Sequence, residues 1–161
     1  MGRKNKLKRF ADVATFPNVY EVDPAQESFL SNQEGSSSDL RGYWASGHYH
    51  NDHPLILELA CGKGDYTVAL AKDHPENNYL GVDIKGARMW KGARHALETG
   101  MNNVAFLRTR IEFIDRFFAP GEVSAIWITF PDPFEGKVTR RLMAAPFLER
   151  YRRILKPGGI V

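Results

Sequence analysis

Residues 123–134 read VSAIWITFPDPF and contain the pattern that decides the fold. The run from Val123 to Thr129 is apolar and rich in β-branched residues, as a strand covered on both faces requires. Pro131 and Pro133 end this strand and prevent a helix, because proline lacks an N–H and restricts the residue before it. Between them stands Asp132, at a strand end where open α/β sheets bind their ligands. We therefore predict a ligand site at this turn.

Strand-like and helix-like segments alternate along most of the chain. Apolar runs indicate strands at residues 54–60, 78–84, 104–107 and 123–130, and helices are expected at 65–73, 85–99, 111–118 and 140–155, the last bent or restarted at Pro146. This alternation predicts an α/β fold, a Rossmann-like doubly wound parallel sheet with right-handed crossovers. Ile160 and Val161 read as the start of a fifth strand, so we expect the sheet to lack its last strands.

The first third of the chain departs from this pattern. We divide the sequence into residues 1–53, a basic N-terminal arm and polar loop, and residues 54–161, the α/β domain. Residues 31–39 are small and polar and predict a loop or a disordered segment. Aromatic residues and histidines follow at 43–53. We interpret the aromatic residues as fixing the arm to the core, a ligand surface being the alternative. No cysteine or carboxylate accompanies the histidines at ligand spacing, so no metal site is predicted.

The composition excludes several classes of protein. The 161 residues are 43% hydrophobic and 25% charged, and no apolar run approaches the roughly 20 residues that a membrane span needs. No secretory signal is visible. A single cysteine, Cys61, which we interpret as a packing residue rather than a nucleophile, fits a reducing cytoplasm. The net charge is only +3, but basic residues cluster at 3–9, 85–94 and 140–156. Such clusters are typical of phosphate-binding surfaces, with solvated helix faces as the alternative.

A glycine-rich turn follows the first predicted strand, in the sequence ELACGKGD of residues 58–65. Gly62 and Gly64 would let a ligand approach the backbone closely. Asp83, at the end of the next predicted strand, occupies the position of an acidic residue that binds ribose hydroxyls. Glu58 would repel a pyrophosphate but suits a cationic ligand. The α/β domain is therefore predicted to bind S-adenosylmethionine rather than NAD.

Five motifs occur in an order typical of one family. They are E-x-x-C-G-x-G from Glu58, GVDIKGAR at 81–88, TFPDPF at 129–134, RRL at 140–142 and LKPGG at 155–159. With these motifs the chain resembles the bacterial tRNA (guanine-N(7)-)-methyltransferases over nearly all of its length. The resemblance implies a Rossmann-like enzyme that transfers a methyl group from S-adenosylmethionine to N7 of a guanosine in the tRNA variable loop.

The resemblance also implies roles for individual residues. The implied cofactor contacts are Glu58, Gly62, Gly64, Asp83 and Asp132, and the implied RNA contacts are Lys137, Arg140 and Arg141. Asp132 would act as the catalytic carboxylate, beside both the cofactor and the guanine. Two positions differ from the family pattern. Arg110 stands where the family usually has an acidic or amide residue, and Phe134 replaces a tryptophan.

Two other functions remain open on the sequence alone. A small-molecule methyltransferase would share Glu58 and Asp83 but would not need the basic clusters. A non-catalytic RNA-binding fragment would keep those clusters and show no affinity for the cofactor. Base stacking and core packing are both open for Phe130, and core packing is the preferred interpretation. Neither the oligomeric state nor the set of tRNA substrates follows from the sequence.

Overall fold

The computed structural model describes residues 2–22, 30–31, 39–131 and 135–161. Within these residues the strands form one seven-stranded sheet in the order β2-β1-β5-β4-β3-β6-β7. The strands are β1 (Val19–Val22), β2 (Leu30–Ser31), β3 (Leu55–Leu59), β4 (Asn78–Asp83), β5 (Val104–Arg108), β6 (Val123–Trp127) and β7 (Leu155–Ile160). Neighbouring strands are parallel except β1 and β2, which are antiparallel. The predicted α/β fold with a parallel sheet is confirmed.

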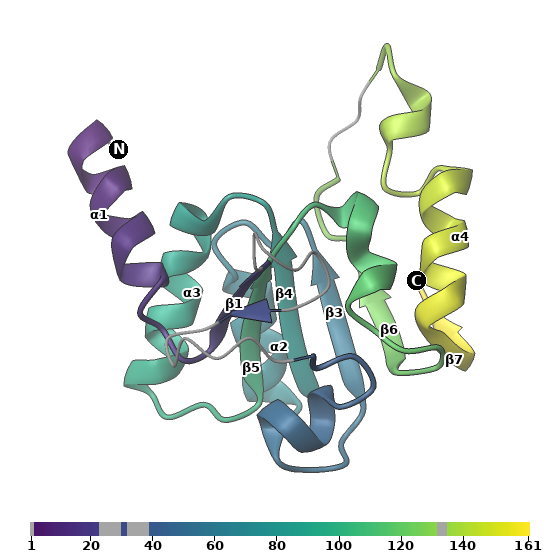
Figure 1. Ribbon diagram of the computed structural model, residues 1–161, viewed down its shortest axis with the longest axis horizontal. Helices are drawn as coiled ribbons and strands as arrows, with labels where there is room; N and C mark the ends of the chain where they lie inside the picture. The colour runs from purple at the N-terminus through teal and green to yellow at the C-terminus, as the bar shows by residue number, and fades with distance from the viewer. Residues whose placement is uncertain (1, 23–29, 32–38, 132–134) are drawn as a thin grey trace.

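Helices cover both faces of the sheet (Figure 1). The α-helices are α1 (Arg3–Val13), α2 (Asp65–Asp73), α3 (Gly86–Glu98) and α4 (Ala145–Ile154), and the shorter helical turns are η1 (Trp44–Tyr49), η2 (Ile111–Arg116) and η3 (Val138–Arg140). On one face α2 and α3 pack against β4 and β5, and α1 lies on α3. On the other face η2 packs with α4. From β3 the chain winds outward to β4 and β5, and later to β6 and β7 on the other side, so the winding reverses between β3 and β6.

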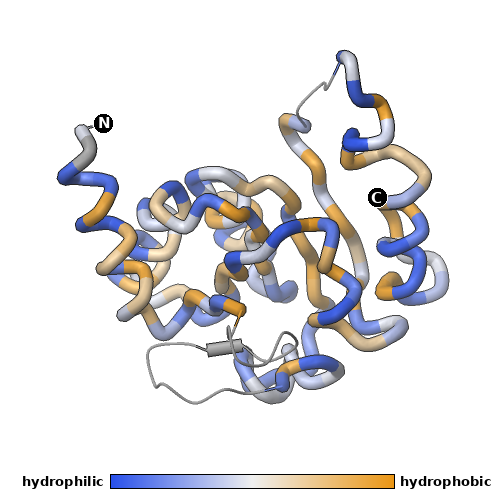
Figure 2. Tube along the Cα trace, turned by 45° about the horizontal axis from the view of Figure 1, so that its top comes forward, coloured by the Kyte–Doolittle hydropathy of each residue, from blue (hydrophilic) through white to orange (hydrophobic). Residues whose placement is uncertain are grey.

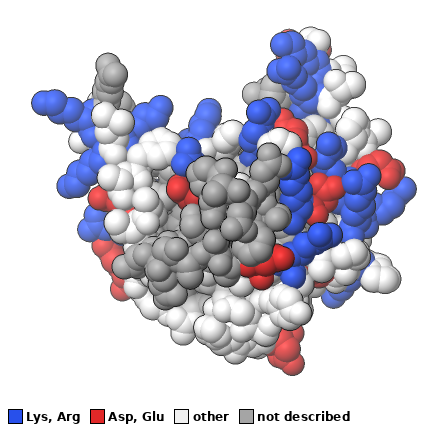
Figure 3. Space-filling view, viewed as in Figure 1, with Lys and Arg blue, Asp and Glu red and all other residues white. Residues whose placement is uncertain are grey.

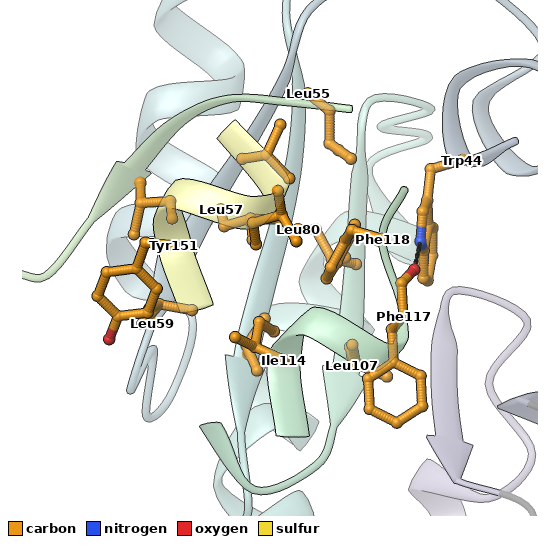
Figure 4. Close-up of a cluster of buried hydrophobic side chains, with 14 of the residues drawn as sticks. Trp44, Leu55, Leu57, Leu59, Leu80, Leu107, Ile114, Phe117, Phe118 and Tyr151 are labelled. Atoms are coloured by element: carbon orange, nitrogen blue, oxygen red, sulfur yellow. Dashed lines mark hydrogen bonds between the residues drawn. The ribbon is translucent and has the colours of Figure 1, made fainter. Parts of the chain in front are cut away.

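Burial on both faces explains why the central strands are almost continuously apolar. Every residue of β4 is buried. Leu80 joins a core cluster with Leu107 and Ile114 on the η2 and α4 face (Figure 4), whereas Tyr79 and Phe106 join a second cluster on the α3 face. Figure 2 shows the apolar residues concentrated along the central strands, while the first turns of α1 are mostly hydrophilic.

The N-terminal third contributes a strand to the sheet. β1 runs parallel to β5, with Tyr20 beside Leu107, although the sequence predicted only an arm and a loop there. Trp44 is fully buried, donates a hydrogen bond of 2.9 Å from Nε1 to the carbonyl of Phe117 (Figure 4), and contacts the ring of Tyr20 edge-on at 5.3 Å. The prediction that the aromatic residues fix the arm to the core is confirmed. Residues 32–38 of the predicted polar loop lie outside the described residues.

Boundaries near the C-terminus differ from the prediction. The predicted restart at Pro146 is confirmed, since α4 begins at Ala145 with Pro146 in its first turn, the only part of a helix that tolerates a residue without an N–H, but the expected helix at 141–144 is absent. That helix ends at Ile154, and Leu155–Ile160 form β7 along β6, where a turn was expected up to residue 159. Pairing with a distant strand supplies hydrogen bonds that the local sequence does not reveal. The predicted helix at 111–118 is the 3₁₀ helix η2.

Three glycines surround the ring of Phe106 from β5. A Cβ atom added to Gly64 would lie 2.5 Å from Phe106 Cε1, and one added to Gly81 would lie 2.8 Å from Cδ1. At Gly92 the added atom would lie 2.7 Å from the carbonyl oxygen of Lys63 and 2.9 Å from Phe106 Cζ. Real Cβ atoms do not approach so closely. The ring therefore requires glycine at all three positions, and it brings α3, β4 and the turn after β3 together.

We predict that Gly92→Ala destabilises the protein by roughly 1–3 kcal/mol, because the new methyl group overlaps a backbone oxygen. In an unpacked helix the same change stabilises by about 0.8–1.0 kcal/mol. Urea denaturation measures the difference. Gly136→Ala is the control, since nothing lies within 4 Å of its added Cβ, and it should change stability by less than about 0.5 kcal/mol. A Gly92→Ala variant as stable as the wild type would contradict this packing.

Candidate active site

A cavity of about 1010 Å³ opens at the carboxyl ends of the central strands. Its lining includes Glu58 from β3, Asp83 from β4, Thr109 after β5 and Thr129 after β6. The winding of the sheet reverses between β3 and β6, and open α/β sheets bind ligands at such a reversal. The site predicted at the strand ends therefore coincides with a cavity.

Glu58 is the most deeply buried carboxylate of this cavity, with 2% of its surface exposed. Thr67 of α2 donates a short hydrogen bond from Oγ1 to Glu58 Oε2, and Thr129 donates one of 3.1 Å to Oε1. Burial raises the pKa of Glu58, and the threonine hydrogen bonds oppose that rise because they stabilise the charged form. One carboxyl group thus joins β3, α2 and the segment that follows β6.

Asp83 is held by the backbone on both of its oxygens. The N–H of Gly62 donates to Oδ2 at 3.0 Å, and the N–H of Lys85 donates to Oδ1 at 2.8 Å. These bonds orient the carboxylate and fix the turn after β3 against the end of β4. A carboxylate offers about four lone-pair sites, so Asp83 keeps acceptor capacity for a ligand in the cavity that it lines.

The turn after β3 is built from left-handed backbone. The φ angle is +56° at Ala60, +58° at Gly62 and +75° at Gly64. Gly62 lines the cavity, whereas Gly64 lies against Phe106 outside the lining, so packing explains its identity. Ala60, which was not predicted as a site residue, also lines the cavity. An alanine in this conformation costs about 1–2 kcal/mol, and such strain is commonly stored at functional sites.

Neither Cys61, which is buried, nor His48, which is half-buried, is poised to react. Burial raises the pKa of the Cys61 thiol well above its usual value, which favours the packing interpretation over a nucleophile. His48 forms a hydrogen bond of 2.7 Å between Nδ1 and the Tyr20 hydroxyl, and burial lowers its pKa to about 4. No group of three or more His, Cys, Asp or Glu that could hold a metal ion occurs among the described residues. No helix in the described ranges is long and apolar enough to cross a bilayer.

The predicted RNA contacts lie close together in the chain, but they reach the cavity unequally. Arg140 lines the cavity, whereas Lys137 and Arg141 flank η3 and are not part of the lining. The predicted catalytic residue, Asp132, lies outside the described residues. Residues 130–131, directly before it, do line the cavity. The cavity therefore brings the start of the FPDPF element, residues 130–131, next to the two buried carboxylates.

Further residues line the cavity that were not predicted from the sequence as ligand contacts. Arg88 of α3 approaches Gly62 so closely that a Cβ added there would lie 3.3 Å from Arg88 Nη2. Ile84 also lines the cavity and is 50% exposed, directly after Asp83. Arg110 also lines the cavity and forms an ion pair of 3.4 Å with Glu112. The basic run at 85–94 was a signal for Arg88, but only the helix geometry shows which of its residues faces the cavity.

The preferred interpretation of Phe130 as a core residue is wrong. Phe130 is 77% exposed and contacts the ring of Tyr66 edge-on, with 5.8 Å between the ring centroids. The reason is that β6 ends at Trp127 rather than at residue 130, so Phe130 lies beyond the last sheet position. Tyr66, in the first turn of α2, is itself 48% exposed, and both rings line the cavity. An exposed aromatic pair therefore forms part of the cavity rim.

The strand order, the acidic strand ends and the cavity at the winding reversal define a Rossmann-like methyltransferase fold, a class that uses S-adenosylmethionine. Solved structures with this fold support the assignment. The antibiotic-resistance methyltransferase Kmr is 22% identical, with a TM-score of 0.61 over 78% of this chain and 66% of its own. The W203A mutant of the 16S rRNA (adenine(1408)-N(1))-methyltransferase from Catenulisporales acidiphilia, solved with SAM, is 21% identical, with a TM-score of 0.59 over 78% and 62%.

Sequence relatives narrow the class to a family. Residues 52–161 match the family Methyltransf_4, described as "Putative methyltransferase". Proteins named tRNA (guanine-N(7)-)-methyltransferase are 52% identical in Bacteroides thetaiotaomicron, over 98% of this chain and 60% of theirs, and 51% identical in Christiangramia forsetii, over 100% and 70%. The chain therefore belongs to the tRNA (guanine-N(7)-)-methyltransferase family, as the motifs predicted. It spans about 60% of the length of the Bacteroides relatives.

We predict that Glu58→Gln becomes more stable relative to the wild type as the pH rises above about 4.5, the ordinary pKa of the carboxyl group. The pKa of Glu58 is higher in the folded than in the unfolded protein, so protonation of Glu58 stabilises the folded state of the wild type at low pH. This contribution is lost as the pH rises through the folded-state pKa. Glutamine stays neutral throughout.

Urea denaturation of both proteins across the acidic and neutral range measures this difference. Glu149→Gln on the exposed face of α4 is the control and should change stability by less than about 0.5 kcal/mol at each pH. A stability difference between Glu58→Gln and the wild type that does not vary with pH would contradict the burial of a charged Glu58.

Proposed function

We propose that this protein transfers a methyl group from S-adenosylmethionine to N7 of a guanosine in the variable loop of tRNA, in the cytoplasm. The observation that carries the proposal is the cavity with two oriented, buried carboxylates, Glu58 and Asp83, at the winding reversal of the sheet. The names of the relatives supply the substrate, and the charge distribution around the cavity supports it.

The residues of the cavity fit the proposed cofactor. Asp83 has free acceptor sites for the two ribose hydroxyls, and Ile84 beside it offers an apolar surface for an adenine ring. Glu58 and Asp83 together provide negative charge for the sulfonium and ammonium groups. Arg88 provides a cation for the carboxylate of the amino-acid part. Gly62 exposes backbone beside these groups.

The chemistry requires positioning more than proton transfer. Bound S-adenosylmethionine supplies an electrophilic methyl group, and guanine N7 already carries the lone pair that attacks it. Holding the two reactants in line can supply about 7–11 kcal/mol of the barrier reduction. We propose that Asp132, confined between two prolines, accepts hydrogen bonds from the guanine edge and favours the positive charge that develops on the base.

Basic side chains stand on both sides of the open strand ends, as a polyanionic substrate requires. Residues 3–11 of α1 contain five basic residues and no acidic one, and the helix projects from the body on one side of the sheet edge (Figure 1). The segment 137–141 rises on the other side, and Figure 3 shows Lys and Arg on both. Trp90 anchors α1, because its Nε1 donates to Asp12 at 2.9 Å. A small-molecule methyltransferase has no need of this charge.

We predict that the wild-type chain binds S-adenosylhomocysteine in calorimetric titration and methylates tRNA at guanosine N7. Asp132→Ala should bind S-adenosylhomocysteine within about twofold of the wild type and lose most methyl transfer, about 10²-fold or more. Binding without tRNA methylation would favour a small-molecule substrate, and no binding at all would favour a non-catalytic RNA-binding role. Asp83→Ala is the contrasting variant, since it should lose cofactor affinity.

We also predict that the aromatic rim stacks on the methylated base. Alanine at Phe130 or Tyr66 should raise the KM for tRNA about 5- to 150-fold, because base stacking on an aromatic ring is worth about 1–3 kcal/mol. Affinity for S-adenosylhomocysteine should not change. Tyr66→Phe is the matched control, since it keeps the ring and removes only the hydroxyl. Unchanged tRNA kinetics in both alanine variants would exclude the stacking role.

A further inference from the structure

A second groove, of about 430 Å³, lies between η2 and α4. Its lining comprises Arg41, Glu112, Phe113, Asp115, Arg116, Arg150 and Arg153, so four guanidinium groups accompany two carboxylates. We call it the arginine groove. It adjoins the cavity, because Glu112 lines both. Figure 3 shows basic side chains gathered beside η2 and α4 on this face.

Backbone carbonyls orient two of the arginines of the groove. Arg150 donates from Nε to the carbonyl of Glu112 at 2.7 Å and from Nη1 to the carbonyl of Pro146 at 2.6 Å. Arg41 donates from Nε to the carbonyl of Phe118 at 3.2 Å. A carbonyl fixes the direction of a guanidinium group but carries no formal charge. Among the described residues, no carboxylate forms an ion pair with Arg41 or Arg150, and each keeps N–H donors for a ligand.

The carboxylates of the groove are engaged with other groups. Asp115 pairs with Arg153 at 2.9 Å, which holds that side chain across the groove between η2 and α4. Glu112 pairs with Arg110 of the cavity wall at 3.4 Å. Arg116 lies over the ring of Phe113 at 4.3 Å. The groove therefore presents oriented guanidinium groups with an excess of positive charge.

We propose that the arginine groove binds a backbone phosphate of the RNA strand whose guanosine enters the cavity. This inference rests on the proposed function, because it needs an RNA substrate. Guanidinium groups bind phosphate through paired, charge-assisted hydrogen bonds, and arginine is the residue best suited to that geometry. A base turned into the cavity leaves its neighbouring phosphates at the cavity mouth, which the groove adjoins at Glu112. The groove would set the register of the strand.

The test compares a double variant and a single control variant, both changed on α4. Their affinity for tRNA is measured by fluorescence anisotropy over a range of salt concentrations. Arg150→Gln combined with Arg153→Gln should weaken binding about tenfold and lower the salt slope by about 1, because the contact with one phosphate is lost. Affinity for S-adenosylhomocysteine and kcat at saturating tRNA should stay unchanged. The matched control is Arg152→Gln, on the same helix outside the groove, with 80% of its side chain exposed. It should leave affinity and slope as in the wild type.

The possible outcomes separate this inference from the proposed function. An unchanged Kd and salt slope in the double variant, with a wild type that binds tRNA, would overturn the groove assignment alone. A wild type that binds S-adenosylhomocysteine but no tRNA would overturn the groove and the proposed substrate together. If the double variant loses S-adenosylhomocysteine binding, the salt slope of tRNA binding is measured instead for the single variant Arg153→Gln. A slope lowered by about 1 supports the groove, and an unchanged slope overturns it.

Discussion

The geometry of the site depends on how closely α3 and the turn after β3 approach the sheet around the ring of Phe106. The glycines around that ring remove the side chains that would hold these elements apart. At this distance the N–H of Gly92 donates to the carbonyl of Lys63 at 3.0 Å, so helix and turn share a hydrogen bond. The same turn then directs the N–H of Gly62 to Asp83. A packing requirement in the core thereby sets the position of a carboxylate in the cavity.

The buried carboxylate of Glu58 also joins separate elements, here through hydrogen bonds. An isolated buried carboxylate is costly, and hydrogen bonds from Thr67 and Thr129 offset part of that cost. Because Thr129 immediately precedes the FPDPF element, its hydrogen bond to Glu58 links the proposed cofactor side of the cavity to the proposed substrate side. The two buried charged groups of the cavity, Glu58 and Asp83, are acidic, whereas exposed basic residues line its walls and gather on α1, on 137–141 and in the arginine groove. A cationic cofactor and a polyanionic substrate would each meet the complementary charge.

Much of the candidate site was predictable because it lies at strand ends. The carboxyl ends of parallel strands meet at one edge of the sheet, so Glu58 and Asp83 had to converge once the strands were identified. The side chains that were missed or misjudged lie where direction matters more than position. Arg88 faces the cavity only because of the rotation of α3, and Phe130 is exposed only because β6 ends three residues earlier than its apolar run.

The sequence by itself determined the α/β class, the central strands, the glycine-rich turn and the family, since local periodicity, turn chemistry and ordered motifs carry that information. The tertiary structure alone decided the pairing of β1 with β5 and of β7 with β6, because such pairing joins segments far apart in the chain. It also decided that Gly64 serves packing while Gly62 faces the cavity. Both glycines have the same left-handed backbone, and only the atoms that surround each in space distinguish them.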